Sequence, residues 1–287
     1  MQSKNQEHFK GIAMDLLVGC GNKKGGLFRV DTESGGAERI TEGNTRGVVR
    51  FKDGYIVNQA NSIHEFDGDL KVTRNNAFFE KCDMHEIFLD WNGLLHVCVT
   101  RKNQIWLMDP NNLCAGPSMV LKLHEDEEDD QIHVNSALFI DQGISAFSSF
   151  CEERNGRDWK DVRGEGKITI RWRTHAGEPM EDVLSGFSHP HSIGLHRASL
   201  YCISSLDKRF QWGQSKVEFA LYPRGVAFTE DRIFVGLSAP RHLPEYQWSD
   251  DLTCGVAILD HDLNKIGFIP IHEATEVFDI CVAHPGK

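Results

Sequence analysis

Asp83-Met84-His85, His133-Val134-Asn135 and His189-Pro190-His191 are three short segments in which a histidine stands at the start of an apolar, strand-like run. A turn and a second apolar run follow each of them, so the same local pattern returns along the chain. Repetition of one β-rich unit is typical of proteins that close a ring of similar sheets. The three segments therefore favour a β-propeller, in which inner strands that are distant in sequence surround one axis.

Six repeated units can be recognised from their first, inner strands. These strands are expected at residues 45–49, 84–88, 134–138, 190–194, 223–227 and 277–281. The last unit has only its inner strand before the chain ends, whereas three further strands, at 12–18, 26–30 and 37–40, precede the first unit. Joining the two ends would leave no open sheet edge at the seam. We predict an all-β, six-bladed β-propeller with its last blade closed in this way, forming a single domain over residues 1–287.

Composition limits the classes of function. The chain of 287 residues is 40% hydrophobic, and its apolar runs are too short to span a membrane. Its first ten residues are polar, which disfavours a secretory signal and favours a cytoplasmic location. The eight cysteines are dispersed without a CxxC pair, as expected of buried thiols. A formal charge of −11 argues against binding to nucleic acid, because that needs a concentrated basic surface.

Five ordered segments carry a resemblance to a known family. They are Asp83-Met84-His85, His133-Val134-Asn135, residues 188–192, residues 222–228 and residues 236–241. This series resembles the DUF4915 family of predicted propellers over roughly residues 83–241. The resemblance implies a six-bladed propeller related in shape to the gluconolactonase and strictosidine-synthase-like group. It implies no particular reaction, and the insertion at residues 151–167 matches less clearly.

The starts of the inner strands predict a site on the propeller axis, because these positions converge in such a ring. Residues two apart in a strand point to the same side, so neighbouring positions would face the channel together. Imidazole and carboxylate are ligands for Zn, Mn, Fe, Ni or Cu. We therefore predict a divalent transition metal held by His133, His189, His191 and Glu276. The alternative is a polar channel in which these imidazoles hydrogen-bond to one another, to Asp83 or to water.

Two arginines predict an anionic ligand. Arg46 and Arg224 occupy equivalent strand starts, and each is followed by glycine. A guanidinium grips a carboxylate or phosphate with two hydrogen bonds, although pairing with buried acidic residues is the structural alternative. We further expect substrate contacts from a polar set of side chains, namely Asn135, Tyr222 and Arg241.

The leading hypothesis is a metal-assisted enzyme, a lyase, hydrolase or isomerase, that acts on a small anionic molecule in the channel. A carbohydrate-like substrate is one option. The metal would stabilise charge on a substrate oxygen, His85 or His191 would transfer a proton, and Arg46 with Arg224 would orient the anion. The main alternative is a noncatalytic propeller that binds a metabolite or a protein. A calcium-dependent lactonase is less favoured, because calcium prefers oxygen ligands.

Overall fold

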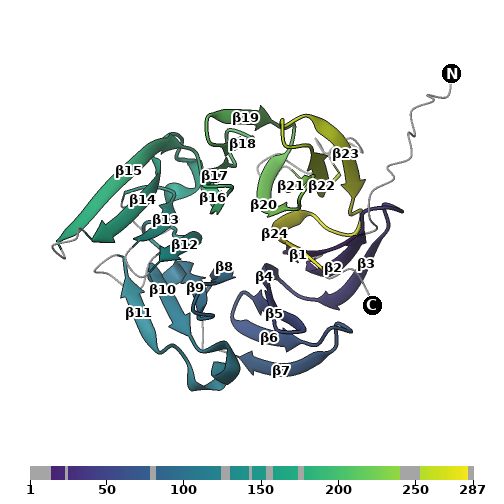
Figure 1. The fold of residues 1–287 in the computed structure, drawn as a ribbon, viewed down its shortest axis with the longest axis horizontal. Helices are drawn as coiled ribbons and strands as arrows, with labels where there is room; N and C mark the ends of the chain where they lie inside the picture. Colours follow the sequence, from purple (N-terminus) through teal and green to yellow (C-terminus); the bar gives the residue numbers. More distant parts are fainter. Residues whose placement is uncertain are drawn as a thin grey trace.

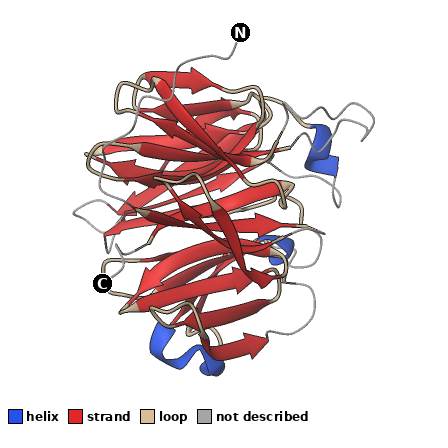
Figure 2. Cartoon of the chain, turned by 90° about the vertical axis from the view of Figure 1, so that its right-hand side faces the viewer, coloured by secondary structure: helices blue, strands red, loops and turns tan. Residues whose placement is uncertain are grey.

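Four-stranded antiparallel sheets form the six blades of a ring (Figure 1). The structure is a computed structural model, and it describes residues 14–22, 25–77, 82–123, 130–141, 144–152, 158–173, 178–239 and 253–283. Nearly all of the ordered secondary structure is strand (Figure 2). The predicted all-β, six-bladed propeller is therefore confirmed.

The inner strand of each blade comes first in the chain in five of the six blades. Blade 1 contains β4 (Thr45–Phe51), β5 (Gly54–Gln59), β6 (Ser62–Phe66) and β7 (Val72–Ala77). Blade 2 contains β8 (Met84–Leu89), β9 (Leu95–Val99), β10 (Gln104–Met108) and β11 (Met119–Lys122). Blade 3 contains β12 (Ser136–Asp141), β13 (Ile144–Ser149), β14 (Gly166–Arg173) and β15 (Pro179–Phe187).

The remaining blades follow the same order up to the seam. Blade 4 contains β16 (Pro190–His196), β17 (Ser199–Ser204), β18 (Arg209–Trp212) and β19 (Ser215–Glu218). Blade 5 contains β20 (Tyr222–Phe228), β21 (Ile233–Ser238), β22 (Gly255–Leu259) and β23 (Lys265–Pro270). Three short 3₁₀ helices, η1 (Thr100–Lys102), η2 (Pro110–Ala115) and η3 (Asp158–Asp161), lie in the connections.

Blade 6 joins the two ends of the chain, as the sequence predicts. It has the order β24 (Glu276–Val282), β1 (Asp15–Gly21), β2 (Gly26–Asp31) and β3 (Ala37–Glu42). β24 pairs with β1 along its length in antiparallel register, from Leu16 opposite Val282 to Gly21 opposite Glu276. The hydrogen bonds of this pair close the ring, so neither strand is left as an open edge at the seam.

The hydrophobic core is divided into wedges between neighbouring blades. Each of the six blade interfaces contains its own cluster of buried apolar side chains. In β1, for example, Leu16 and Val18 pack toward blade 5, whereas Leu17 packs toward blade 1. This division follows from the alternation of side chains along a strand. Every blade therefore needs both neighbours to bury its two faces.

Bulges interrupt the inner strands at the level of the channel. The pairing of the inner strand with the next strand shifts register at this level in β4, β8, β16, β20 and β24. Arg46, Gly225 and Phe278 are each the extra residue of such a bulge. A bulge re-aims side chains and removes backbone groups from the sheet ladder. At the bulges, side chains of the inner strands therefore point in directions that a regular strand would not give them. The backbone groups there need hydrogen-bond partners outside their own sheet.

The neighbouring blade supplies those partners. The amide of Val48 donates to Oδ2 of Asp279 at 2.9 Å, and the amide of Ile193 donates to Oγ of Ser136 at 2.8 Å. The amide of Gly225 likewise donates to Oγ of Ser192 at 3.0 Å. Because buried amides must be hydrogen-bonded, these contacts both satisfy the bulges and fix one blade against the next.

The bond between Ser192 and Gly225 gives a testable consequence for stability. Ser192→Ala removes the acceptor of a buried amide, so we expect the free energy of unfolding to fall by about 1–3 kcal/mol. Ser185→Ala, on the exposed outer strand β15, is the matched control and should change it by less than about 0.5 kcal/mol. Urea denaturation of the three proteins measures both values. Equal stability of both variants would contradict this role of Ser192.

Candidate functional site

Three residues just before inner strands have left-handed backbone conformations. Asp83, His133 and His189 have φ angles of 49°, 50° and 57°. This conformation costs a residue other than glycine about 1 kcal/mol, and such strain is found preferentially at functional sites. The three residues occupy the same place in successive blades. Their recurrence indicates that the backbone is held there to aim the side chains.

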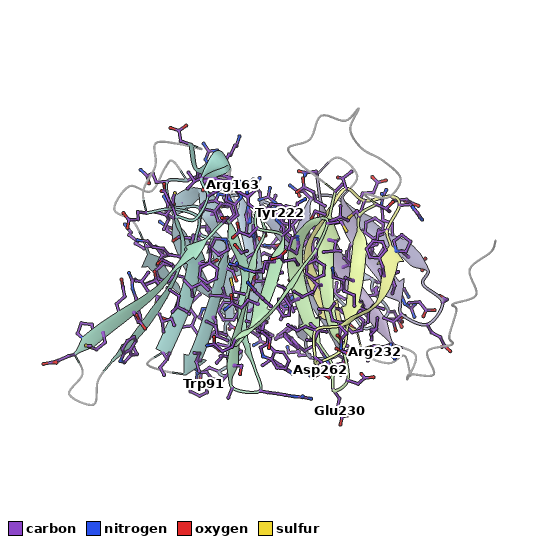
Figure 3. All side chains as sticks on the ribbon, turned by 90° about the horizontal axis from the view of Figure 1, so that it is seen from above. Trp91, Arg163, Tyr222, Glu230, Arg232 and Asp262 are labelled. Carbon is purple, nitrogen blue, oxygen red and sulfur yellow. The ribbon has the colours of Figure 1, made fainter. Side chains whose placement is uncertain are left out.

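All three side chains line one cavity of about 290 Å³ at the channel. Its wall is formed by Arg46, Asp83, His85, His133, Phe150, Trp159, Lys160, His189, Tyr222, Arg224 and Phe278. Figure 3 places Tyr222 toward one face of the ring, with Trp91, Glu230 and Arg232 at the opposite face. The cavity therefore belongs to the face on which the inner strands begin.

Phe278 is the hub of this cavity. Its ring centre lies 5.9 Å from that of His85, which belongs to blade 2. The guanidinium carbons of Arg46 and Arg224 lie 5.4 Å and 4.4 Å from the same ring centre. A cation over an aromatic face is attracted to it. One aromatic side chain of the closing strand thus brings together groups from three other blades.

The two arginines pair with different acidic side chains, and Arg224 is the more deeply buried of the two. Arg46 forms an ion pair with Asp83 and a bond of 3.5 Å from Nε to Oδ1 of Asn44. Arg224 is only 2% exposed, and its Nη1 lies 3.4 Å from Oε2 of Glu276. Within the described residues, Nε of Arg224 has no hydrogen-bond partner. Arg224 therefore keeps donor capacity that its protein neighbours do not use.

His133 is held by a carboxylate and by aromatic rings. Its Nδ1 lies 2.8 Å and 3.0 Å from the two carboxylate oxygens of Asp130. Nε1 of Trp159 donates to the same carboxylate at 3.2 Å, and the Trp159 ring centre lies 3.6 Å from that of His133. These contacts fix the plane of the imidazole and place the Nδ1 hydrogen toward Asp130.

His189 is held by two hydrogen bonds and by stacking. Nε2 donates to the carbonyl of Trp159 at 3.1 Å, and Nδ1 lies 3.1 Å from the hydroxyl of Tyr222. Its ring is stacked on Phe150 at 4.1 Å between centres. Both ring nitrogens of His189 are therefore used within the protein.

His191 has one nitrogen bonded and one not. Nδ1 donates to the carbonyl of His189 at 2.9 Å and lies 2.7 Å from Oγ of Ser205. Nε2 is buried and has no partner among the described residues. Burial and the nearby charge of Arg224 lower the pKa of His191 well below its usual value, so the ring is neutral at pH 7.

His85 lies in the same positive environment. Burial first, and then Arg46 and Arg224, lower the pKa of His85 well below its usual value. No described residue forms a hydrogen bond with either of its ring nitrogens. His85 is thus a neutral imidazole in the cavity wall, able both to donate and to accept one hydrogen bond.

The other predicted site residues lie in different places. Asn135 is buried and accepts from Oγ of Ser148 at 3.3 Å, outside the lining of the cavity. Glu276 pairs with Arg224 and also bonds with Asn22. Arg241 lies outside the described residues. Six predicted site residues thus line one cavity, namely Arg46, His85, His133, His189, Tyr222 and Arg224, whereas His191, Asn135 and Glu276 lie outside its lining.

The predicted metal ligands do not form a coordination group in this arrangement. In the described part of the chain, no group of three or more His, Cys, Asp or Glu side chains is placed to hold a metal ion. His189 uses both nitrogens, and Glu276 is paired with Arg224. A metal held by these residues stays a prediction that elemental analysis of untagged protein would test, and binding it would require those bonds to break.

Five wall residues were not among the predicted catalytic, substrate-binding or metal residues, namely Asp83, Phe150, Trp159, Lys160 and Phe278. Asp130, which contacts Nδ1 of His133, was likewise not among the predicted site residues. Trp159 and Lys160 belong to the insertion at 151–167. The position of Asp130 three residues before His133 was the available signal, but spacing alone does not distinguish a buried partner from a surface charge.

Glu86 and Asp279, which follow His85 and Phe278 in the chain, are two carboxyl groups that interact electrostatically. Burial, and then the charge of Asp279, raise the pKa of Glu86 well above its usual value. Burial raises the pKa of Asp279 to about 7, although the amides of Val48 and Ile280 stabilise its ionised form. Both residues keep some accessible surface, but neighbouring carboxyls with raised pKa values cannot both ionise readily near pH 7.

Fold and site together define a six-bladed propeller with a polar cavity of mixed histidine, arginine and aromatic lining at its axis. The family model described as "Domain of unknown function (DUF4915)" matches residues 28–285. The chain therefore belongs to the DUF4915 family, and the match extends well beyond the segments that carry the sequence resemblance.

Solved structures support the fold at low sequence identity. A protein of unknown function from Bacteroides caccae is 11% identical, with a TM-score of 0.65 over 95% of this chain and 99% of that one. A chain of the nidogen/laminin complex is 11% identical, with a TM-score of 0.64 over 94% and 98%. A streptogramin B lyase is 10% identical, with a TM-score of 0.50 over 79% and 83%. These similarities show the fold alone. No curated protein matches the chain.

No helix in the described part of the chain is long and apolar enough to cross a membrane. The cytoplasmic location stays a prediction.

The carboxyl pair predicts a pH-dependent stability. The unfolded groups ionise near pH 4, whereas the folded pair keeps a proton up to about pH 7. The stabilisation is therefore complete below pH 4 and is lost as pH rises through 7. Between pH 5 and pH 7 we expect this pair to contribute a loss of about 1 kcal/mol per pH unit, against the gain that the lowered pKa values of His85 and His191 contribute as pH rises toward 7.

Urea denaturation across this pH range measures the slope. Glu86→Gln removes one of the two charges and should reduce the loss by about half or more. Glu230→Gln, at an exposed position on the opposite face, should leave the slope unchanged. An identical slope for wild type and Glu86→Gln would show that the pair does not share a proton.

Proposed function

We propose that this protein binds a small anionic molecule in the channel cavity and exchanges a proton with it, as a lyase or isomerase does. The observation that carries the proposal is Arg224. It is a guanidinium that is 2% exposed, lies at the cavity wall and has one hydrogen bond of 3.4 Å among the described residues. A buried cation with unfilled donors is costly, and a bound carboxylate or phosphate would fill them with two parallel hydrogen bonds.

The charge around the cavity supports an anion. Its lining contains three cationic side chains, Arg46, Lys160 and Arg224, and one acidic side chain, Asp83. This sign is opposite to the formal charge of −11 of the whole chain. The lowered pKa values of His85 and His191 have the arginines among their causes, as expected in a positive electrostatic field. An anion in the cavity would offset that field.

Neutralisation of the positive field by a bound anion would also favour proton transfer by His85. As a neutral imidazole it has a lone pair that accepts a proton, and an anion bound beside Arg46 and Arg224 would raise its pKa toward neutral pH. A base with a pKa near the working pH is the most effective. In this proposal the arginines hold the carboxylate, and His85 removes a proton from the adjacent carbon. The resulting negative charge is stabilised by the two guanidinium groups.

Substitutions of opposite effect test anion binding. Arg224→Gln removes the buried cation, so we expect the affinity for the tightest-binding of phosphate, acetate and malonate to fall about tenfold or more. Asp83→Asn removes the competing charge at Arg46 while keeping a residue that tolerates the left-handed conformation, so affinity should rise about fivefold. Calorimetric titration measures both, with Arg232→Gln on the opposite face as control. If none of these anions binds wild type, the proposal fails.

Proton exchange distinguishes an enzyme from a metabolite-binding propeller. In D₂O, wild type should catalyse the exchange of the hydrogens next to the carboxylate of bound malonate, at least tenfold above the rate without protein. His85→Phe keeps an aromatic ring against Phe278 but has no base, so exchange should be lost while calorimetric binding persists. Proton NMR measures the exchange. Binding without exchange in wild type would favour the noncatalytic alternative.

A further inference from the structure

The hydrogen-bond partners of His189 determine what the Tyr222 hydroxyl can do. The carbonyl of Trp159 is an acceptor only, so Nε2 of His189 carries the hydrogen in their 3.1 Å contact. With the His189 ring neutral, as its burial beside a carbonyl and a hydroxyl favours, Nδ1 is an acceptor and the Tyr222 hydroxyl donates to it at 3.1 Å. The only hydrogen of that hydroxyl is thereby used. Toward the cavity, Oη of Tyr222 offers lone pairs and acts as a hydrogen-bond acceptor.

This acceptor stands beside the strongest candidate anion ligand. Tyr222 and Arg224 are two residues apart in β20, and both line the cavity. The guanidinium carbon of Arg224 lies 4.9 Å from the centre of the Tyr222 ring. One part of the wall therefore combines cationic donors with a neutral oxygen acceptor. A carboxylate alone matches the donors only, because an ionised carboxylate has no hydrogen to give to Oη.

His85 adds a second acceptor in the wall. Its lowered pKa keeps the ring neutral, so one ring nitrogen has a lone pair. The described residues do not occupy that nitrogen. Acceptors next to arginines call for a ligand that has hydroxyl hydrogens close to its negative group. A site with buried hydrogen-bonding groups strongly prefers a ligand with hydroxyls over an analogue without hydroxyls. The analogue would leave those buried groups of the site unpaired.

We infer that the ligand of the channel cavity is a hydroxy acid, with its carboxylate at Arg224 and a neighbouring hydroxyl donating to Oη of Tyr222. This inference rests on the proposed anion binding at the same cavity and narrows it to one chemical class. Tyr222 is then a specificity residue, which distinguishes hydroxylated carboxylates from plain ones.

Three probe molecules separate recognition of the carboxylate from recognition of the hydroxyl. D-gluconate has a carboxylate and hydroxyls, hexanoate has the carboxylate alone, and sorbitol has the hydroxyls alone. By calorimetric titration at pH 7 we expect gluconate to bind at least tenfold more tightly than hexanoate, and sorbitol not to bind. The apolar chain of hexanoate favours contact with the aromatic side chains of the wall. The preference for gluconate must therefore exceed the affinity that hexanoate gains from this contact.

A variant locates the hydroxyl recognition. Tyr222→Phe keeps the ring beside Arg224 and removes Oη, so the affinity for gluconate should fall about tenfold while that for hexanoate stays unchanged. Tyr201→Phe, on β17 outside the cavity lining, is the matched control and should alter neither. Unchanged hexanoate binding also shows that Tyr222→Phe has kept the fold of the site.

The outcomes distinguish failure of the inference from failure of the proposed function. If hexanoate binds as tightly as gluconate, or if Tyr222→Phe weakens both equally, the hydroxy-acid inference is overturned and anion binding stands. If phosphate binds but neither organic acid does, the inference is again overturned while the cavity remains an anion site. If no anion binds at all, both are wrong.

Discussion

The structure depends on hydrogen bonds between bulged inner strands and their neighbouring blades. The bulges leave residues such as Ile193 and Gly225 without a partner in the ladder of their own sheet, and side chains of the adjoining blade accept their amide hydrogens. The amide of Val48, which follows the bulge at Arg46, is accepted by Asp279 in the same way. Because a buried amide without an acceptor is costly, the bulge and the blade interface must form together. The blades are thus joined at the axis by specific bonds as well as by apolar wedges.

This constraint also shapes the cavity. A bulge turns an extra side chain toward the axis, and Phe278 is brought in this way against His85, Arg46 and Arg224. The residues next in the chain, Glu86 and Asp279, are carboxyl groups whose pKa values are raised. Burial is the first cause of these raised values and of the lowered pKa of His85, because it disfavours the charged form of either kind of group.

The hydrogen-bond partners of the histidines indicate different chemical roles for them, although the histidines occupy similar positions. His189 is a structural group with both nitrogens bonded, whereas His85 is a neutral imidazole available at the wall. His133 is oriented by Asp130. Sequence patterns treat these histidines alike, because each stands at the start of an inner strand. Their burial, hydrogen-bond partners and neighbouring charges differ, and these differences are the basis of the proposed arginine-based anion site.

The amino-acid sequence by itself determined the repeated strands, the closure of the last blade by both chain ends, and the convergence of Arg46, His85, Tyr222 and Arg224. These features follow from strand alternation and from the geometry of a closed ring, which are readable along one chain. Only the tertiary structure decided the insertion of Trp159 beside His133, the pairing of Glu276 with Arg224 and the coupling of Glu86 to Asp279. The first contact joins a connection of blade 3 to the start of its inner strand, and the other two join different blades. The chemistry of all three depends on distances and on water exclusion that arise when the ring closes.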